Sequence, residues 1–172
     1  MGNIVIGGDI DRTIGIKAFN DIQWRRGRRN FDYGSGKNYK IITDYLLKRF
    51  GVINICYDPN FISQEENKKS LQLALNGDFD TTTSMSILNV IKDKNKRLDI
   101  IKIMKSSLKK GGVAYFKIFQ GDKKGVWKKN KEYIYYQNNK KIEEYIPEIK
   151  SVFTKGGIKT YPNKSLIIAW NN

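Results

Sequence analysis

The pattern of apolar and polar positions alternates between two periods along the chain. Residues 41–50 and 93–110 carry apolar side chains three and four positions apart, which predicts two amphipathic helices. Around them lie short runs of apolar and β-branched residues bounded by glycine, proline or aspartate, which predict strands. These runs are residues 52–57, 80–85 and 113–119, and the last is the clearest strand in the sequence.

Glycine and proline mark where several of these elements should begin and end. Gly51 directly follows the first helix, a position that favours glycine because this residue readily adopts the left-handed conformation. The pair Gly111-Gly112 is expected to stop the second helix. Proline is favoured in the first turn of a helix, so Pro147 predicts a last helix over residues 147–154.

Strands alternate with helices until two final strand-like runs, 158–161 and 166–170, which predict an antiparallel hairpin. This order predicts an α/β fold, a three-layer sandwich around a mostly parallel sheet. The 172 residues suit one domain, with residues 1–30 as an N-terminal preface or lid and residues 120–141 as a basic, aromatic insertion. Ligands of such sheets bind beyond the carboxyl ends of the strands, where functional residues are therefore expected.

The chain contains no histidine and a single cysteine, Cys56. Histidine-dependent catalytic triads and most zinc sites are therefore excluded, and no metal is expected. A lone cysteine cannot form an internal disulfide and fits a reducing compartment. No apolar run approaches the ~20 residues that cross a bilayer, and the first residues lack the plan of a signal peptide. A cytoplasmic protein without membrane contact is expected.

Lysine and arginine outnumber aspartate and glutamate by 32 to 17, which leaves a net charge of +15. The excess is clustered in residues 25–29, which hold four arginines, and in residues 102–131, which hold ten lysines against one acid. Such clusters favour polyanions because neutralised phosphates release counterions, so DNA or RNA is an expected partner. The alternative is a solvated basic face in a chain from an AT-rich coding sequence, since lysine, isoleucine and asparagine are all abundant.

The stretch NFDYGSGKNY, residues 30–39, places an acidic residue and two glycines before the first predicted helix. It is not a P-loop, because its Gly-Lys pair is followed by asparagine in place of serine or threonine. It also lacks the third glycine of a dinucleotide fingerprint, which Tyr39 replaces. What remains is an acidic turn in which Asp32, Gly34 and Gly36 are spaced two residues apart.

A second carboxylate, Asp58, directly follows the strand over residues 52–57. The two acids suit a nucleoside that carries a positive charge, because Asp32 can face an ammonium and Asp58 can accept both ribose hydroxyls. The glycines allow the backbone to approach such a ligand closely. Asp32 would repel a pyrophosphate but not S-adenosylmethionine. A helix cap at Asp32 and simple turns at the glycines and at Asp58-Pro59 are the alternatives.

Four segments taken together resemble motifs of class I S-adenosylmethionine-dependent methyltransferases. They fall in the order of that family, and the likeness covers roughly residues 30–170. A fifth segment, TIGIK at residues 13–17, is similar to a preface found in small stand-alone bacterial and phage-type members. The four segments are DYGSG at 32–36, YDP at 57–59, DTTTSMSILNVI at 80–91 and LKKGGVAYFKI at 108–118.

The resemblance implies a seven-stranded Rossmann-like sheet whose sixth and seventh strands are the terminal hairpin. It also implies S-adenosylmethionine as the cofactor, held by Asp32, Gly34, Gly36, Asp58, Ser84 and Met85. The first three would line the methionine part and Asp58 would hold the ribose. Ser84 and Met85, at the end of the fourth strand, would lie beside the reacting methyl group.

Three departures from the family pattern change the expectations. Residues 28–30 are polar and precede Phe31, so the first strand is expected to be short or to lie at a frayed edge. Only the segment 59–79 separates Asp58 from Asp80, which compresses the usual helix and third strand. The fourth strand also lacks the Asn/Asp-Pro-Pro-aromatic run of amino-group nucleic-acid methyltransferases, which argues against that chemistry.

No catalytic residue is assigned, since the cofactor would supply the activated methyl group and a general base is optional. If a base is required, the candidates are Asp9, Asp11 or a tyrosine. Trp127, Tyr133, Tyr135 and Tyr136 either stack on bases or form the core of the insertion. Substrate contacts are expected from Thr13, Lys17, Arg25, Arg26 and Asn89, although Asn89 could equally cap the helix that follows.

The leading interpretation is a methyltransferase that acts on a nucleic acid or a nucleotide-like substrate. One alternative is methylation of a small metabolite or a protein, with the basic clusters incidental. Another is a methyltransferase-like protein that binds nucleic acid but has lost turnover. The short first strand and the compressed middle segment keep this last interpretation open.

Overall fold

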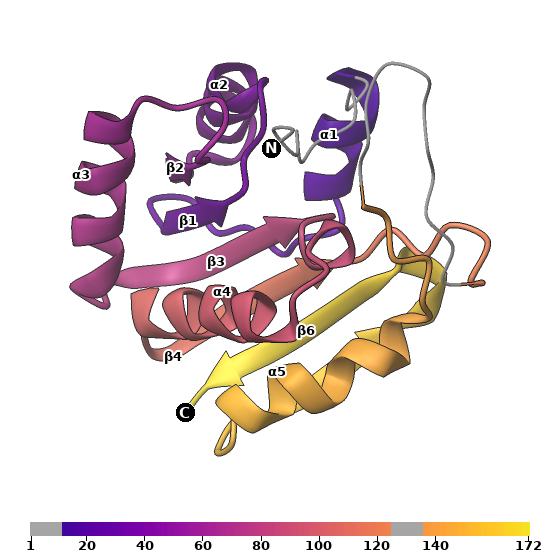
Figure 1. Cartoon of the computed structure of the whole chain (residues 1–172). Coiled ribbons are helices and arrows are strands. Elements are labelled where there is room, and N and C mark those ends of the chain that lie inside the picture. Colours follow the sequence, from indigo (N-terminus) through magenta and orange to yellow (C-terminus); the bar gives the residue numbers. More distant parts are fainter. Residues whose placement is uncertain (1–11, 125–135) are drawn as a thin grey trace.

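The computed structural model describes residues 12–124 and 136–172, with side chains from residue 15 onward. Helices and strands alternate through most of this part of the chain (Figure 1). In chain order the elements are α1 (Arg12–Phe19), β1 (Arg29–Tyr33), α2 (Tyr39–Phe50), β2 (Ile53–Tyr57), α3 (Gln64–Leu75), β3 (Phe79–Met85), η1 (Leu88–Val90), α4 (Lys94–Ser107), β4 (Leu108–Lys117), η2 (Ile142–Tyr145), α5 (Ile146–Val152), β5 (Ile158–Tyr161), η3 (Pro162–Lys164) and β6 (Leu166–Asn171).

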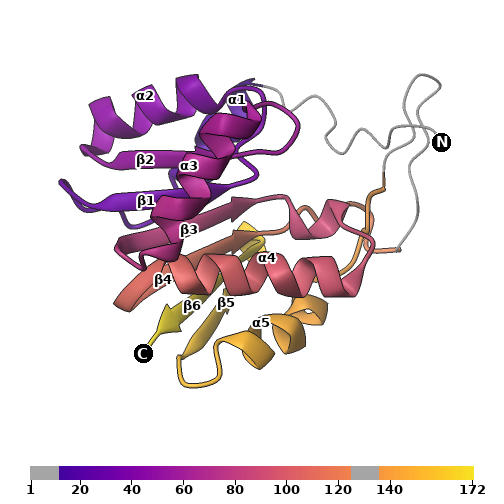
Figure 2. The same ribbon diagram turned by 60° about the vertical axis from the view of Figure 1, so that its left-hand side comes forward.

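One sheet organises these elements, with the strand order β2-β1-β3-β4-β6-β5. Strands β1 to β4 are parallel, and β6 runs antiparallel to both of its neighbours, β4 and β5. Helices α1 and α2 lie on one face of the sheet, and α3, α4 and α5 lie on the other (Figures 1 and 2). The predicted three-layer α/β sandwich with a mostly parallel sheet is confirmed, and its last two strands pair antiparallel.

The described part of the chain has six strands and not the seven expected. The segment 59–79, between Asp58 and Asp80, forms α3 and its connections, and it adds no strand of its own before β3. The helix begins at a cap in which the Ser63 hydroxyl accepts the Glu66 N–H, and its 12 residues lead directly toward β3. A further crossover between parallel strands would need about a dozen more residues. β2 is therefore an edge strand of the described sheet.

β1 is short, as expected, but it lies inside the sheet and not at a frayed edge. It pairs with β2 on one side and with β3 on the other. The backbone N–H of Arg29 donates to Asp80 Oδ2 at 2.9 Å. The buried amide of Asn30 donates to Asn54 Oδ1 at 2.7 Å and to Thr83 Oγ1 at 2.9 Å. The central position tolerates these polar residues because both neighbouring strands supply hydrogen-bond partners.

Glycines act differently at the ends of the two long helices. Gly51 ends α2 in the left-handed conformation, φ 66°, as predicted. α4, however, ends at Ser107, before the expected Lys110, and Gly111 and Gly112 lie inside β4. The register of β4 against β3 shifts in this region, and Gly111 has a φ of 76°. The glycine pair therefore lies at a bulge in the strand and does not stop the helix.

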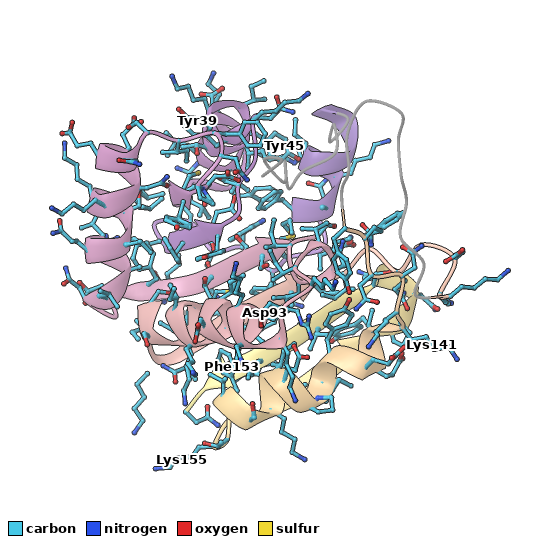
Figure 3. All side chains as sticks on the ribbon, viewed as in Figure 1. Tyr39, Tyr45, Asp93, Lys141, Phe153 and Lys155 are labelled. Atoms are coloured by element: carbon cyan, nitrogen blue, oxygen red, sulfur yellow. The ribbon has the colours of Figure 1, made fainter. Side chains whose placement is uncertain are left out.

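Apolar cores lie on both faces of the sheet. On one face Met104 of α4 packs with Phe116 of β4 and with Phe153, the residue after α5 (Figure 3). On the other face Phe19 of α1 and Leu46 of α2 belong to a smaller cluster. Both sheet faces are thus held by helices, although the second is covered less completely, as the hollow described below shows.

Candidate functional site

The glycine turn, residues 34–36, connects β1 to α2 at the carboxyl end of the parallel strands. Its position is the switch point of the sheet, because β1 has β2 on one side and β3 on the other. Gly34 and Gly36 have φ values of 78° and 70°, which glycine adopts without strain. The N–H of Gly34 donates to the Tyr57 carbonyl at 2.7 Å and fixes the turn to the end of β2. Tyr39, in place of a third glycine, begins α2 (Figure 3).

Asp58 is buried beside this turn and holds it in place. Its Oδ2 accepts the Gly36 N–H at 2.8 Å, and its Oδ1 accepts the N–H groups of Asn60 and Phe61 at 2.9 and 3.2 Å. Asn67 of α3 in turn binds the backbone of Asp58 through both ends of its amide. Oδ2 keeps capacity for a further donor. The ribose role of Asp58 stays a prediction, and the structure adds a role in shaping the turn.

Asp32, near the end of β1, is 1% exposed and only half satisfied. Its Oδ1 accepts the Thr83 hydroxyl at 2.7 Å, whereas its Oδ2 is buried without a hydrogen-bond partner. Burial raises the pKa of this carboxyl to about 7, and the charge of Asp58 raises it further, whereas the Thr83 hydrogen bond and the nearby amide of Asn54 act in the opposite direction. A buried, unpaired carboxylate oxygen is costly, and a cation bound beside it would relieve that cost.

A buried polar network surrounds Asp32 that the sequence analysis did not identify. Thr83 donates to Asp32 and accepts from Asn30, which also donates to Asn54. The amide of Asn54 donates in turn to Thr43 of α2. The available signal was the pair Asn30 and Asp32, two positions apart in β1, together with the polar run of residues 80–84 in β3, which places several polar groups on one face of the sheet.

Ser84 and Met85 do not join Asp32 in a single cluster. Asp32 and Thr83 are hydrogen-bonded and share the α2 side of the sheet. Ser84 follows Thr83 in the same strand and so points to the opposite face, where its hydroxyl is buried without a partner. Met85 points back to the α2 side but packs in the apolar cluster with Phe19.

The segment after β3 covers the glycine turn. Ser86 has a φ of 62°, a conformation that costs a residue other than glycine ~1–3 kcal/mol. Its N–H donates to the Lys117 carbonyl at 2.8 Å, which keeps this turn beside β4. The side chain of Ile87 then occupies the space beside Gly34, where a Cβ atom would meet it. A ligand against Gly34 would therefore contact or displace Ile87.

The arginine cluster separates in the structure. Arg25 is exposed in the connection between α1 and β1, whereas the side chain of Arg26 packs over Gly51 at the end of α2. Lys17 is exposed on α1. These three expected substrate residues thus lie in different places, and their substrate roles stay predictions.

Asn89, also expected at the substrate, is 1% exposed. Its amide donates to Gln137 Oε1 at 3.2 Å, and its Oδ1 accepts the Phe119 N–H at 3.3 Å. Asn89 therefore joins η1 to Phe119, just before the insertion, and to Gln137 within it, and it caps no helix. Its geometry favours a structural role over contact with a substrate.

Several expectations fall on residues outside the described part. These are Asp9, Asp11, Trp127, Tyr133, Tyr135 and the side chain of Thr13. Within residues 12–124 and 136–172, no group of three or more aspartate, glutamate and cysteine side chains is arranged to hold a metal ion. The helices described there include none that is long and apolar enough to span a membrane.

Comparisons with known proteins identify the fold. No protein-family model and no curated protein sequence matches the chain. Solved structures do match, among them a phosphoethanolamine N-methyltransferase from Haemonchus contortus in complex with S-adenosylmethionine, with 15% identity and a TM-score of 0.55. That match covers 86% of this chain but only 38% of the nematode enzyme, so the chain spans well under half of its length.

Two further matches extend this result. A 1,6-didemethyltoxoflavin N1-methyltransferase from Burkholderia thailandensis matches at 13% identity and a TM-score of 0.59, over 94% of this chain and 77% of that enzyme. A 16S ribosomal RNA methyltransferase from T. thermophilus matches at 13% identity and a TM-score of 0.57, over 98% of this chain and 42% of that enzyme. The chain therefore has the fold of class I S-adenosylmethionine-dependent methyltransferases.

Proposed function

We propose that this protein binds S-adenosylmethionine and transfers its methyl group. The observation that carries the proposal is the unpartnered, buried oxygen of Asp32 at the switch point of a methyltransferase fold. A carboxylate there suits the positively charged amino-acid end of this cofactor. The matched enzymes that carry this cofactor or its product, S-adenosylhomocysteine, support the same assignment.

The residues present fit the cofactor at its two charged or polar ends. Asp32 would balance the ammonium, and Gly34 and Gly36 would let the backbone approach the methionine part. Asp58 would accept the ribose hydroxyls while it keeps the turn in shape. The cofactor supplies an activated methyl group, so the protein needs to position the acceptor and exclude water. Ile87, beside Gly34, is well placed to exclude water.

The proposed methyl acceptor is a nucleic acid or a nucleotide-like molecule. The net charge of +15 supports it, because clustered cations favour polyanions. A ribosomal RNA enzyme among the structural matches is consistent with it. The matched phosphoethanolamine and toxoflavin-precursor enzymes support a second candidate, a small-molecule acceptor.

Titration calorimetry with S-adenosylmethionine tests the cofactor assignment. We expect binding by the wild-type chain and a loss of at least about tenfold in affinity for Asp32→Asn, since a charge-assisted contact is removed. Asp44→Asn is the matched control, because Asp44 lies exposed on α2 and pairs with the exposed Lys48. No heat of binding to the wild-type chain would overturn the proposal.

Methyl transfer itself is tested with labelled cofactor and separate pools of DNA, RNA, protein and small metabolites. Label in the nucleic-acid pools supports the first acceptor, and label only in the metabolite pool supports the second. A chain that binds the cofactor and labels none of the pools would be a methyltransferase-like binding protein.

A further inference from the structure

A hollow of about 630 Å³ lies on the side of the sheet that carries α1 and α2. Its floor is formed by residues of β4 and β6 that point away from α4 and α5, such as Val113 and Ile168. Figures 1 and 2 show α3, α4 and α5 on the opposite face only. None of the residues that line the hollow belongs to the glycine turn, so the hollow is a separate surface, and it has the size of an ordinary ligand site.

The rim of the hollow is basic. Five cationic side chains line it: Arg25, Arg28, Lys109, Lys159 and Lys164. They come from three separate regions of the sequence, so the fold and not a single charge run assembles them. The arginine cluster and the lysine-rich segment, which the sequence showed as separate features, supply three of the five, and the terminal hairpin supplies the other two.

Two carboxylates, Asp21 and Asp80, also line the hollow, and both are already neutralised. Asp80 pairs with Arg28 at 2.8 Å and with Lys109. Asp21 pairs with Lys117 at 2.6 Å and with Lys164 at 3.4 Å. The remaining cations leave the surface positive, which is complementary to a polyanion.

Aromatic rings lie among these charges. Tyr161 and Trp170 are half-buried at the hollow, and the ammonium of Lys159 lies 5.0 Å from the centre of the Tyr161 ring. Rings interleaved with basic groups are typical of surfaces that bind single strands, because bases stack on the rings while phosphates meet the cations. A duplex presents mainly phosphates to a protein surface, and its paired bases are not free to stack on such rings.

We propose that single-stranded nucleic acid docks in this hollow. The proposal rests on the nucleic-acid part of the proposed function but not on methyl transfer or cofactor binding. It assigns to this hollow, which the described helices leave open, the partner that the charge of the whole chain suggests. A second copy of this chain is a poorer occupant, since it would bring the same net charge of +15 to a positive surface.

Fluorescence anisotropy with a labelled single-stranded 12-mer of mixed sequence tests the proposal on the full chain. The test variant is Arg25→Glu with Lys159→Glu, which reverses two exposed charges at the rim. The matched control, Lys68→Glu with Lys96→Glu, makes the same charge change on α3 and α4, across the sheet. Calorimetry with S-adenosylmethionine is run in parallel, so that failure of the cofactor assignment is seen separately.

We expect the rim variant to lose at least about tenfold in affinity and the control about threefold or less, with a weaker salt dependence in the rim variant only. The duplex of the same sequence should bind less tightly than the single strand. Equal losses in the two variants, tighter binding of the duplex, or no binding of either oligonucleotide would overturn the proposal. Circular dichroism checks that both variants fold.

Discussion

The two faces of the sheet are built on different principles. On the α3–α5 face, helices cover the strands, and a largely buried ion pair between Arg97 of α4 and Glu148 of α5 lies beside the largest apolar core. On the α1–α2 face, the helices leave a basic hollow, and polar groups replace much of the core around Asp32. One face is closed by helices, although the Ser84 hydroxyl is buried there without a partner, while the other has an open hollow and an unpartnered carboxylate oxygen.

This difference indicates that one face of the sheet contributes mainly to stability and the other mainly to binding. Closed apolar layers contribute most of the free energy of folding, whereas unsatisfied polar groups and open charged surfaces reduce it. Proteins keep such costly features mainly where a ligand offsets the cost. Mutations on the closed face should therefore change stability, and mutations on the open face should change binding.

The largest expected effect is on the closed face. Arg97 binds both carboxylate oxygens of Glu148, at 2.8 and 2.7 Å, and its Nη1 group donates to the carbonyls of Ile91 and Lys92. Arg97→Met leaves the largely buried carboxylate of Glu148 without its partner, so the free energy of unfolding should fall by about 3–5 kcal/mol. Urea unfolding followed by circular dichroism measures it.

Two variants sharpen this result. Lys102→Met breaks an exposed pair with Asp99 on the same helix and should cost less than about 1 kcal/mol. Arg97→Met with Glu148→Leu removes both buried charges and should recover much of the loss. If Arg97→Met lowers the free energy of unfolding no more than Lys102→Met, the pair of Arg97 with Glu148 does not stabilise the closed face.

A smaller effect is expected at the glycine turn. Gly27 and Gly34 have nearly equal φ values, 77° and 78°, but a Cβ at Gly27 meets nothing within 4 Å, whereas at Gly34 it would meet Ile87. Gly27→Ala should therefore cost about 1–2 kcal/mol for backbone strain alone. Gly34→Ala should cost roughly 1–2 kcal/mol more for overpacking.

Adding Ile87→Ala to Gly34→Ala separates the two causes. Relative to Ile87→Ala alone, the double variant should lose only the free energy that is due to backbone strain at position 34. The overpacking cost disappears because the Ile87 side chain that causes it has been removed. Thermal or urea unfolding of the four proteins gives the coupling. A coupling near zero would mean that Ile87 does not lie against the turn.

Asp32 should make stability depend on pH. Its pKa is about 7 in the folded chain and 3.8 when unperturbed, so the folded state binds the proton more tightly. Between about pH 4 and 7 the unfolded chain loses this proton first, and the free energy of unfolding falls as the pH rises through that window. Above pH 7 the contribution of this group is constant.

Asp32→Asn removes this titration. We expect the variant to be close to the wild type in stability near pH 4 and more stable by about 1–3 kcal/mol at pH 8, where the wild type buries an unsatisfied charge. The difference between the two proteins at each pH cancels the other titrating groups. A difference that does not change with pH would show that Asp32 titrates normally.

Most of the fold was predictable from local sequence patterns. The errors in the prediction concern features that depend on contacts between segments far apart in the sequence. Helical and strand periodicity over residues 41–57 was enough for α2 and β2. Gly111-Gly112 misled, because glycine pairs occur both after helices and in strand bulges, and only the register of β4 decides between these. Seven strands were expected because of the family resemblance. The segment 59–79 is, however, too short to hold both α3 and a further strand.

For the candidate site, too, some features were predictable from sequence order and others depend on contacts between strands. Asp32, the glycines and Asp58 lie close together because each lies at or just after the carboxyl end of β1 or β2, which sequence order alone reveals. Ser84 and Asp32 point to opposite faces of the sheet, which only the pairing of Thr83 with Asp32 reveals, and the expected place of Ser84 beside the methyl group stays a prediction. The role of Asp58 in holding Gly36 also depends on contacts between two strands.

The smallest expected effect on stability is at the basic hollow. Arg25→Glu with Lys159→Glu alters two exposed side chains on the open face, so the free energy of unfolding should change by less than about 0.5 kcal/mol. Lys68→Glu with Lys96→Glu, on the closed face, should behave alike, because exposed charges contribute little wherever they lie. Urea unfolding at low and high salt compares the free energies of unfolding of these two double variants, which carry the same change of net charge. If the hollow variant alone lost several times the change expected for surface residues, its cations would be part of the folded structure, and the separation of a stabilising face from a binding face would fail.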